Sequence, residues 1–169
     1  MKYIEAQNYK LEIGSIVNSS LNELLIKSYS TAKKVIIVDE NTNEHCLDAL
    51  ITNFEALKDA EIILLPVGEE NKQLFIAQNA WEALTEYGVG RYDLILNLGG
   101  GVITDMGGFI ASCYKRGCDF INIPTSLLAM VDASLGGKTG VNLGYYKNQI
   151  GVFCILTHHF WKHCRMKNT

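Results

Sequence analysis

The sequence predicts an α/β fold of the Rossmann-like kind, with a parallel β-sheet flanked by helices. Short apolar runs rich in Val and Ile alternate with helix-like segments, which is the pattern of strand and helix repeats. One apolar run leads directly into Gly99, Gly100 and Gly101, as a tight strand-to-helix turn requires. The 169 residues are 48% hydrophobic and 20% charged, a globular composition for one ordinary domain.

The N-terminal part supplies a peripheral strand and the first core strand. Residues 9–13 alternate weakly in polarity and predict an edge strand, and residues 21–28 predict a short helix. The run KKVIIVD, residues 33–39, has the length and β-branching of a buried parallel strand. Residues 43–54 predict a helix after it.

The next unit pairs a strand with a longer helix. Residues 61–66 read EIILLP and predict a second core strand, which Pro66 ends because proline cannot donate to a ladder. Residues 73–88 predict a helix, with Asn71 as its N-cap and Gly88 as its C-terminal stop.

The glycine turn lies between a third and a fourth core strand. Residues 93–98 predict the strand before it, residues 103–114 an apolar helix after it, and residues 119–123 the fourth strand. Residues 124–153 mix Gly, Thr, Ser, Asn and Lys with short apolar pieces, which predicts a long loop, a short helical turn and a hairpin. Irregular segments of this length inside a domain are usually functional.

Charge and cysteine content exclude some classes of partner. The net charge of −3 argues against a nucleic-acid surface, which needs clustered Lys and Arg. No stretch approaches the roughly 20 apolar residues of a membrane span, and the N-terminus carries no apolar leader segment. The five cysteines form no CxxC pair and fit reduced thiols, so we expect a cytoplasmic protein.

The glycine turn is a candidate phosphate site. A helix that starts directly after the glycines offers free N–H groups and the positive end of its dipole to a pyrophosphate. The alternative is a tight turn that binds no ligand, and the motif alone does not decide between them. The turn also departs from the usual dinucleotide fingerprint, because Thr104 stands at the third glycine position and the turn follows the third core strand.

Polar residues follow the other core strands at the same sheet edge. Asp39 ends the first strand, where an acid can accept ribose hydroxyls, although it could instead form a turn before Asn41. Glu69 and Lys72 follow the second strand, with a solvated loop as the alternative interpretation. Their convergence with the glycine turn is more informative than any one of them.

The segment 124–153 carries a second group of polar residues. Asp132, Lys138, Lys147 and Asn148 lie among glycines. Lysines and an asparagine on such a scaffold suit a small polyhydroxy acid with a phosphate or carboxylate group. A surface loop with ordinary solvated lysines is the alternative.

Five motifs, in this order and at these spacings, resemble the sugar-phosphate cyclase family, and within it the 3-dehydroquinate synthases. They are GEENK, GGGVITDMGGF, CYKRG, IPTSLLAMVDASLGGKTGVN and KNQIGVF, and the likeness covers roughly residues 33–153. The family implies conversion of a seven-carbon keto-acid phosphate (DAHP) to 3-dehydroquinate and phosphate, in the shikimate route to aromatic amino acids. It also implies NAD, zinc or cobalt, and a homodimer.

The resemblance assigns roles to residues position by position. Asp39 and Asn41 would touch the adenosine end of NAD, residues 67–72 its ribose, the glycine turn its pyrophosphate, and Thr125 with Ser126 its nicotinamide side. The substrate positions would be Asp132, Lys138, Lys147, Asn148 and Arg116. The full cofactor set is Asp39, Asn41, Val67, Gly68, Glu69, Glu70, Asn71, Lys72, Gly100, Gly101, Val102, Ile103, Thr104, Asp105, Thr125, Ser126, Lys138 and Lys147.

The sequence departs from the family mildly at two positions and strongly at its end. Thr104 stands where the family often has Gly, and Ser126 where Thr is commonest. After Phe153 the family continues into an all-helical domain with one Glu and two His for the metal, whereas this chain reads CILTHHFWKHCRMKNT. Its histidines and cysteines fit no familiar zinc spacing, so we assign no metal ligands.

The expected organisation is therefore an NAD-binding α/β domain over 1–153 and a divergent tail over 154–169, as a truncation or frameshift would leave, with the helical metal domain missing. On this interpretation the chain alone is an inactive fragment of the enzyme. A cyclase acting on another sugar phosphate and a non-catalytic NAD-binding module are the alternatives.

Overall fold

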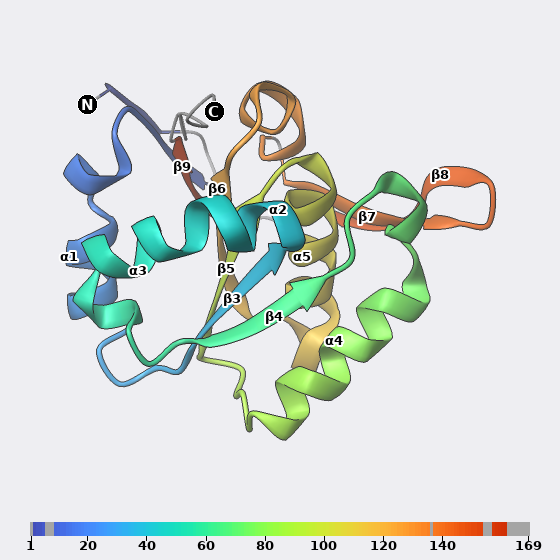
Figure 1. The fold of residues 1–169 in the computed structure, drawn as a ribbon, viewed down its shortest axis with the longest axis horizontal. Helices are drawn as coiled ribbons and strands as arrows, with labels where there is room; N and C mark the ends of the chain where they lie inside the picture. The colour runs from blue at the N-terminus through green and yellow to red at the C-terminus, as the bar shows by residue number, and fades with distance from the viewer. Residues whose placement is uncertain (1, 6–8, 136, 154–156, 162–169) are drawn as a thin grey trace.

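The computed structural model describes residues 2–5, 9–135, 137–153 and 157–161, and within these ranges the chain forms one large sheet and a separate hairpin. Seven strands form the sheet in the order β1-β2-β9-β6-β5-β3-β4 (Figure 1). Their bounds are β1 (Lys2–Glu5), β2 (Tyr9–Ile13), β3 (Lys34–Asp39), β4 (Glu61–Leu65), β5 (Leu94–Gly99), β6 (Asp119–Pro124) and β9 (Thr157–Trp161), and the hairpin joins β7 (Lys138–Leu143) to β8 (Tyr146–Phe153).

Helices cover both faces of the sheet, which confirms the predicted Rossmann-like fold (Figure 1). They are α1 (Leu21–Lys27), α2 (Glu40–Thr42), α3 (Asp48–Asn53), α4 (Leu74–Glu86) and α5 (Gly101–Cys113), with a π-helical turn at Asn43–Leu47 and another, η6, at Ala129–Ala133. Single 3-10 turns lie at Ile16–Asn18, Glu55–Leu57, Glu69–Asn71 and Tyr114–Arg116. Among the described residues no helix is long and apolar enough to cross a bilayer.

The interior strand β3, between β5 and β4, shows why the core is predictable from apolar runs. Val35 and Ile37 pack into the cluster under α4 and α5, whereas Ile36 and Val38 pack into the cluster under α1 and α3. All four are 0% exposed. A strand buried on both faces has no polar alternation, and β3 pairs in parallel with both β4 and β5.

The sheet extends further than the predicted edge strand. Residues 9–13 form a strand, as predicted, but not the edge, because β1 pairs with β2 antiparallel on its outer side. On its inner side β2 pairs in parallel with β9, and β9 pairs in parallel with β6. Part of the predicted tail, residues 157–161, is therefore a strand between β2 and β6, while 154–156 and 162–169 lie outside the described residues.

Two helix starts differ from the prediction. The helix predicted to start at residue 43 begins at Glu40, because the Asp39 carboxylate accepts the Thr42 N–H at 2.8 Å and caps it. Asn71 does not cap α4, whose N-cap is Gln73, because Asn71 belongs to the 3-10 turn Glu69–Asn71, where its amide donates to the Val67 carbonyl at 2.7 Å. Gly88, with a φ of +65°, follows the C-cap of α4 and ends the helix as predicted.

We expect Gly108→Ala to destabilise the fold, although alanine for glycine in a helix interior usually stabilises it by up to about 1 kcal/mol. A Cβ at Gly108 would lie 2.4 Å from Thr139 Cγ2 and 3.2 Å from Phe120 Cζ, because α5 packs directly against β7 and the sheet. Overpacking of this kind costs about 1–3 kcal/mol. Urea unfolding should therefore show a lower midpoint.

Gly101→Ala is the matched control for this substitution, since a Cβ there meets nothing closer than Ala133 Cβ at 3.6 Å. Its urea midpoint should stay near that of the wild type. A Gly108→Ala protein as stable as the wild type would show that α5 tolerates a side chain against β7.

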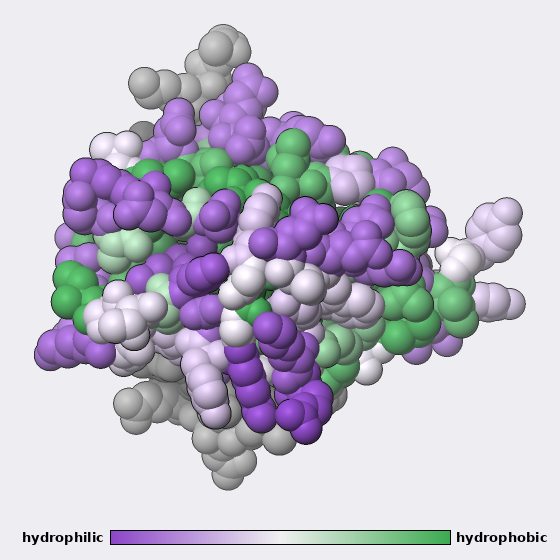
Figure 2. Space-filling model, turned by 90° about the horizontal axis from the view of Figure 1, so that it is seen from below, coloured by the Kyte–Doolittle hydropathy of each residue, from purple (hydrophilic) through white to green (hydrophobic). Residues whose placement is uncertain are grey.

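The hairpin projects from the body of the molecule (Figure 1). Seen from below, the surface is mostly hydrophilic, hydrophobic residues lie in scattered patches, and the hairpin extends at the right edge (Figure 2). Tyr145 and Tyr146 at its turn are 104% and 71% exposed, so the tip makes little contact with the rest of the chain. The base of the hairpin, in contrast, packs against α5 and forms part of the site described next.

Candidate functional site

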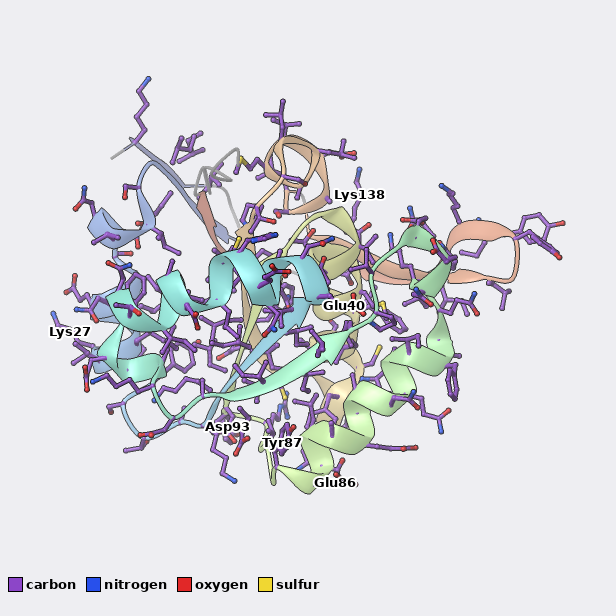
Figure 3. All side chains as sticks on the ribbon, in the orientation of Figure 1. Lys27, Glu40, Glu86, Tyr87, Asp93 and Lys138 are labelled. Atoms are coloured by element: carbon purple, nitrogen blue, oxygen red, sulfur yellow. The ribbon has the colours of Figure 1, made fainter. Side chains whose placement is uncertain are left out.

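A pocket of about 660 Å³ opens where the carboxyl ends of the core strands meet the hairpin. In Figure 3, Lys138 lies at the upper end of the molecule, close to the start of α5, whereas Asp93 and Tyr87 lie at the lower end. The pocket brings together nine residues that the sequence singled out: Glu69, Lys72, Gly101, Val102, Asp105, Asp132, Lys138, Lys147 and Asn148. The meeting of Glu69, Lys72 and the glycine turn follows the prediction that parallel strands end at one sheet edge, whereas the approach of the 124–153 residues to that edge was not predicted from the strands.

The glycine turn forms one wall of the pocket at the start of α5. Gly100 is the N-cap, with φ −75° and ψ −166°, and among the described residues no side chain caps the helix. A Cβ added at Gly100 would meet only Ser126, at 3.5 Å from Oγ. The backbone of the turn therefore has room for a close approach by an anionic group, which the helix N-terminus would favour.

Lys72 is the most buried charged group of the pocket, at 2% exposed. Its ammonium donates to Asp105 Oδ2 at 2.5 Å and to Asn148 Oδ1 at 2.6 Å. These bonds join the loop after β4 to the first turns of α5 and to the hairpin. Burial raises the pKa of Asp105 above its ordinary value, and the bond and charge of Lys72 draw it back.

Asn142 of β7 is a pocket-side residue that the sequence analysis missed. Its side-chain amide donates to the carbonyl of Glu69 at 3.2 Å and to Glu69 Oε1 at 3.0 Å, and its Oδ1 accepts the Asn148 N–H at 2.9 Å. The Asn142 N–H donates to the Lys72 carbonyl at 2.7 Å. We call Glu69, Lys72, Asp105, Asn142 and Asn148 the polar junction.

Exposed charges surround the polar junction on the hairpin side. Asp132 lies on η6, Lys138 at the start of β7 and Lys147 in β8, and all three are exposed and line the pocket. Two lysines at the rim could attract an anionic ligand through charge, while the polar junction could fix its hydroxyl groups by hydrogen bonds.

Other predicted cofactor residues do not line the pocket. The Asp39 Oδ1 atom caps α2, although a carboxylate has a second oxygen, and Asn41 is exposed on α2 beside it. Ile103 and Thr104 are buried, and the Thr104 hydroxyl donates to the Gly100 and Gly101 carbonyls, so these two can reach a ligand only through their backbone.

The remaining cofactor candidates follow β4 and β6. Val67, Gly68, Glu70 and Asn71 belong to the loop after β4. The Val67 N–H donates to Glu40 Oε2 at 2.7 Å, which ties this loop to α2. Thr125 and Ser126 follow β6, and the Thr125 N–H donates to the Gly99 carbonyl at 2.9 Å, so this segment lies beside the glycine turn.

Arg116 is the one predicted substrate residue that this chain holds far from the pocket. It is exposed in the turn after the C-terminus of α5. The 13 residues of α5 separate it from the glycine turn by roughly 20 Å. No group of three His, Cys, Asp or Glu side chains within the described ranges could hold a metal ion.

A comparison with known families identifies the chain. The sequence profile of a family described as "3-dehydroquinate synthase N-terminal" matches residues 62–165. The chain belongs to the 3-dehydroquinate synthase family. The 3-dehydroquinate synthase of Parabacteroides distasonis is 42% identical over 144 residues, which cover 85% of this chain and 40% of the relative. The chain thus spans about 40% of the length of the relative that it matches.

Solved structures of sugar-phosphate cyclases share the fold of this chain. A 2-deoxy-scyllo-inosose synthase complexed with carbaglucose-6-phosphate, NAD⁺ and Co²⁺ superposes with a TM-score of 0.77 at 26% identity, over 91% of this chain and 42% of that one. A 2-epi-5-epi-valiolone synthase from Streptomyces hygroscopicus with NAD⁺ and Zn²⁺ bound gives 0.77 at 27% identity, over 96% and 45%.

Proposed function

We propose that this chain provides the NAD-binding part of a 3-dehydroquinate synthase and the substrate contacts that surround it. The observation that carries the proposal is the convergence of the glycine turn, the buried Lys72 and the hairpin residues on one pocket. The open approach to the backbone at Gly100 suits a pyrophosphate, which the first N–H groups of α5 would bind. Family membership supports NAD as the nucleotide and DAHP as the substrate.

The residues of the pocket would bind and orient the reactants. NAD, when bound, would oxidise a ring hydroxyl of the substrate by taking a hydride from the carbon that bears it, and would later return that hydride. Lys138 and Lys147 would hold the phosphate or carboxylate of the substrate at the rim of the pocket, and Asn148 would hydrogen-bond a hydroxyl group. Asp132, on η6, would accept hydrogen bonds from further hydroxyls.

The described residues do not fit the zinc or cobalt that the family implies, so we assign it no ligands here. Sequence identity favours a 3-dehydroquinate synthase over another sugar-phosphate cyclase. The 3-dehydroquinate synthase of Parabacteroides distasonis is 42% identical to this chain, whereas the two other cyclases are 26% and 27% identical. A non-catalytic NAD-binding module would share the glycine turn, but it would not need the rim lysines.

A homodimer, as the family implies, would give Arg116 a route to substrate. Arg116 cannot reach the pocket of its own chain across the length of α5. If it contacts substrate, it does so in the pocket of a second copy.

Calorimetric titration tests this function. We expect saturable binding of NAD to the purified chain, followed by weaker binding of DAHP to the NAD-loaded chain. Lys138→Ala and Lys147→Ala should weaken DAHP binding by about tenfold each, since each removes a charge-assisted hydrogen bond. Lys27→Ala, on α1 far from the pocket (Figure 3), should leave DAHP binding unchanged.

Each outcome distinguishes among the candidate functions. The absence of saturable NAD binding would refute the proposal. NAD binding with no effect of the two rim lysines on DAHP would favour the non-catalytic module.

A further inference from the structure

The hairpin has an irregular ladder where it meets the loop after β4. Val141 pairs with Ile150 and Leu143 pairs with Tyr146, so Asn142 alone lies opposite the three residues 147–149. Asn148, in the middle of this bulge, has a φ of +52°, a left-handed conformation that side chains other than glycine rarely adopt. Asparagine is among the few residues that tolerate this conformation, but a restraint is still needed in place of the ladder bonds that the bulge interrupts.

Asn142 supplies that restraint. Its Oδ1 accepts the Asn148 N–H, which takes the place of a ladder bond that the bulge interrupts. Its amide donates twice to Glu69, and its own N–H donates to the Lys72 carbonyl. Asn142 is 8% exposed, so these bonds are shielded from water.

We propose that Asn142 is a positioning residue, which sets the geometry of Glu69, Lys72 and Asn148 in the pocket without itself contacting the reactants. This inference rests on the proposed function, since it concerns how that pocket is held ready for NAD and substrate. Asn142 is bonded to Glu69, 73 positions away in the sequence, and to Asn148, so it acts on both segments at once.

The positioning has a chemical consequence at Asn148. A lysine ammonium only donates hydrogen bonds, so the Asn148 atom that faces Lys72 must be the oxygen. The NH₂ group of the same amide therefore faces away from Lys72, and Asn148 is exposed and lines the pocket. Asn142 holds the backbone of Asn148 and the carbonyl of Lys72, and Lys72 in turn orients the Asn148 side chain as a hydrogen-bond donor toward a ligand.

Asn142→Ala tests the inference with two readouts. We expect NAD affinity to fall about tenfold, because a displaced Glu69 and Lys72 lose well-placed hydrogen bonds to the ligand. Independently of any ligand, hydrogen exchange of the backbone N–H of Asn148, followed by NMR, should accelerate by at least about tenfold once its acceptor is gone.

Asn122→Ala is the matched control, since Asn122 is also a buried asparagine, 2% exposed, and its Oδ1 accepts from Asn97 away from the pocket. It should lower the melting temperature but leave NAD affinity and Asn148 exchange at wild-type values. The same pattern for Asn142→Ala, a lower melting temperature alone, would overturn the inference.

Asn142→Asp separates the effect on Asn148 from the effect on Glu69, and it serves as the test if Asn142→Ala does not fold. The new carboxylate still accepts the Asn148 N–H but repels Glu69, so Asn148 exchange should stay slow while NAD affinity falls. Fast Asn148 exchange in this variant would overturn the inference. If the wild-type chain binds no NAD, the proposed function fails, and Asn148 exchange in the variants still decides the role of Asn142.

Discussion

Replacing Lys72 with methionine should lower the stability of the fold by about 3 kcal/mol or more at neutral pH, because breaking a buried ion pair leaves an uncompensated charge. The Lys72 side chain is 3% exposed and that of Asp105 19%, so water can replace little of the lost bond. Asn148 Oδ1 also loses its donor. Urea unfolding of wild type and variant gives the difference.

The stability lost in Lys72→Met should become smaller as the pH falls. The pKa of Asp105 already lies above its ordinary value of 3.8 because of burial, and removing Lys72 takes away the influence that lowers it. Between 3.8 and the higher pKa of the folded state, the folded protein binds the extra proton, so stability rises as pH falls through this window. The difference between Lys72→Met and wild type should therefore shrink in mildly acidic buffer.

A second substitution should recover most of the stability at neutral pH. In Lys72→Met/Asp105→Leu the buried charge is gone, and a well-packed apolar pair is often as stable as the ion pair that it replaces. Lys27→Met is the exposed control: Lys27 pairs with Glu23 at 2.6 Å, but their side chains are 72% and 62% exposed, so unfolding should not change measurably. A Lys72→Met protein that is equally destabilised at every pH would contradict the role given to Asp105.

The core strands and the pocket edge were predictable because their signals are local. β3 and β5 are buried along their length, so their apolar runs need no tertiary information to be recognised. Parallel strands end at one edge of a sheet, which is why Asp39, the loop with Lys72 and the glycine turn could be placed together. The comparison of families confirmed the resemblance that these motifs carry.

What could not be predicted depends on contacts between distant segments. The N-cap of α4 is Gln73 rather than the predicted Asn71, because Asn71 is taken up in the 3-10 turn Glu69–Asn71. Asn142 reads as an ordinary strand residue until Glu69 is known to lie beside it. The pairing of β9 with β2 and β6 likewise has no local signal, since it depends on strands far away in the chain.

The position of Arg116 shows the limit of carrying roles over by motif. The motif CYKRG matches the family in sequence, but the match does not say which copy's pocket the Arg116 side chain would contact. The geometry of α5 places Arg116 at the end of the helix that lies away from the glycine turn. A role in substrate binding therefore stays a prediction that depends on a second copy.

Gly100→Val should abolish detectable NAD binding while the chain stays folded. The backbone at Gly100 has φ −75° and ψ −166°, an extended conformation that valine adopts readily, and the nearest atom to a new Cβ is Ser126 Oγ at 3.5 Å. The branched side chain would instead occupy the space through which a pyrophosphate must approach the helix N-terminus. Loss of two charge-assisted hydrogen bonds of about 1.5 kcal/mol each weakens binding roughly 100-fold or more.

Three companion measurements make the Gly100 result specific to the ligand. Circular dichroism should be unchanged in Gly100→Val, since a Cβ there meets only Ser126, at ordinary contact distance. Gly100→Ala should give an intermediate affinity, because its single methyl group reaches less far. Gly90→Ala, in the loop before β5, has its Cβ 3.4 Å from Asp93 Oδ2 and no link to the pocket, so NAD affinity should stay at the wild-type value. Equal NAD binding by the wild type and Gly100→Val would place the pyrophosphate elsewhere, because no phosphate could approach the turn past that side chain.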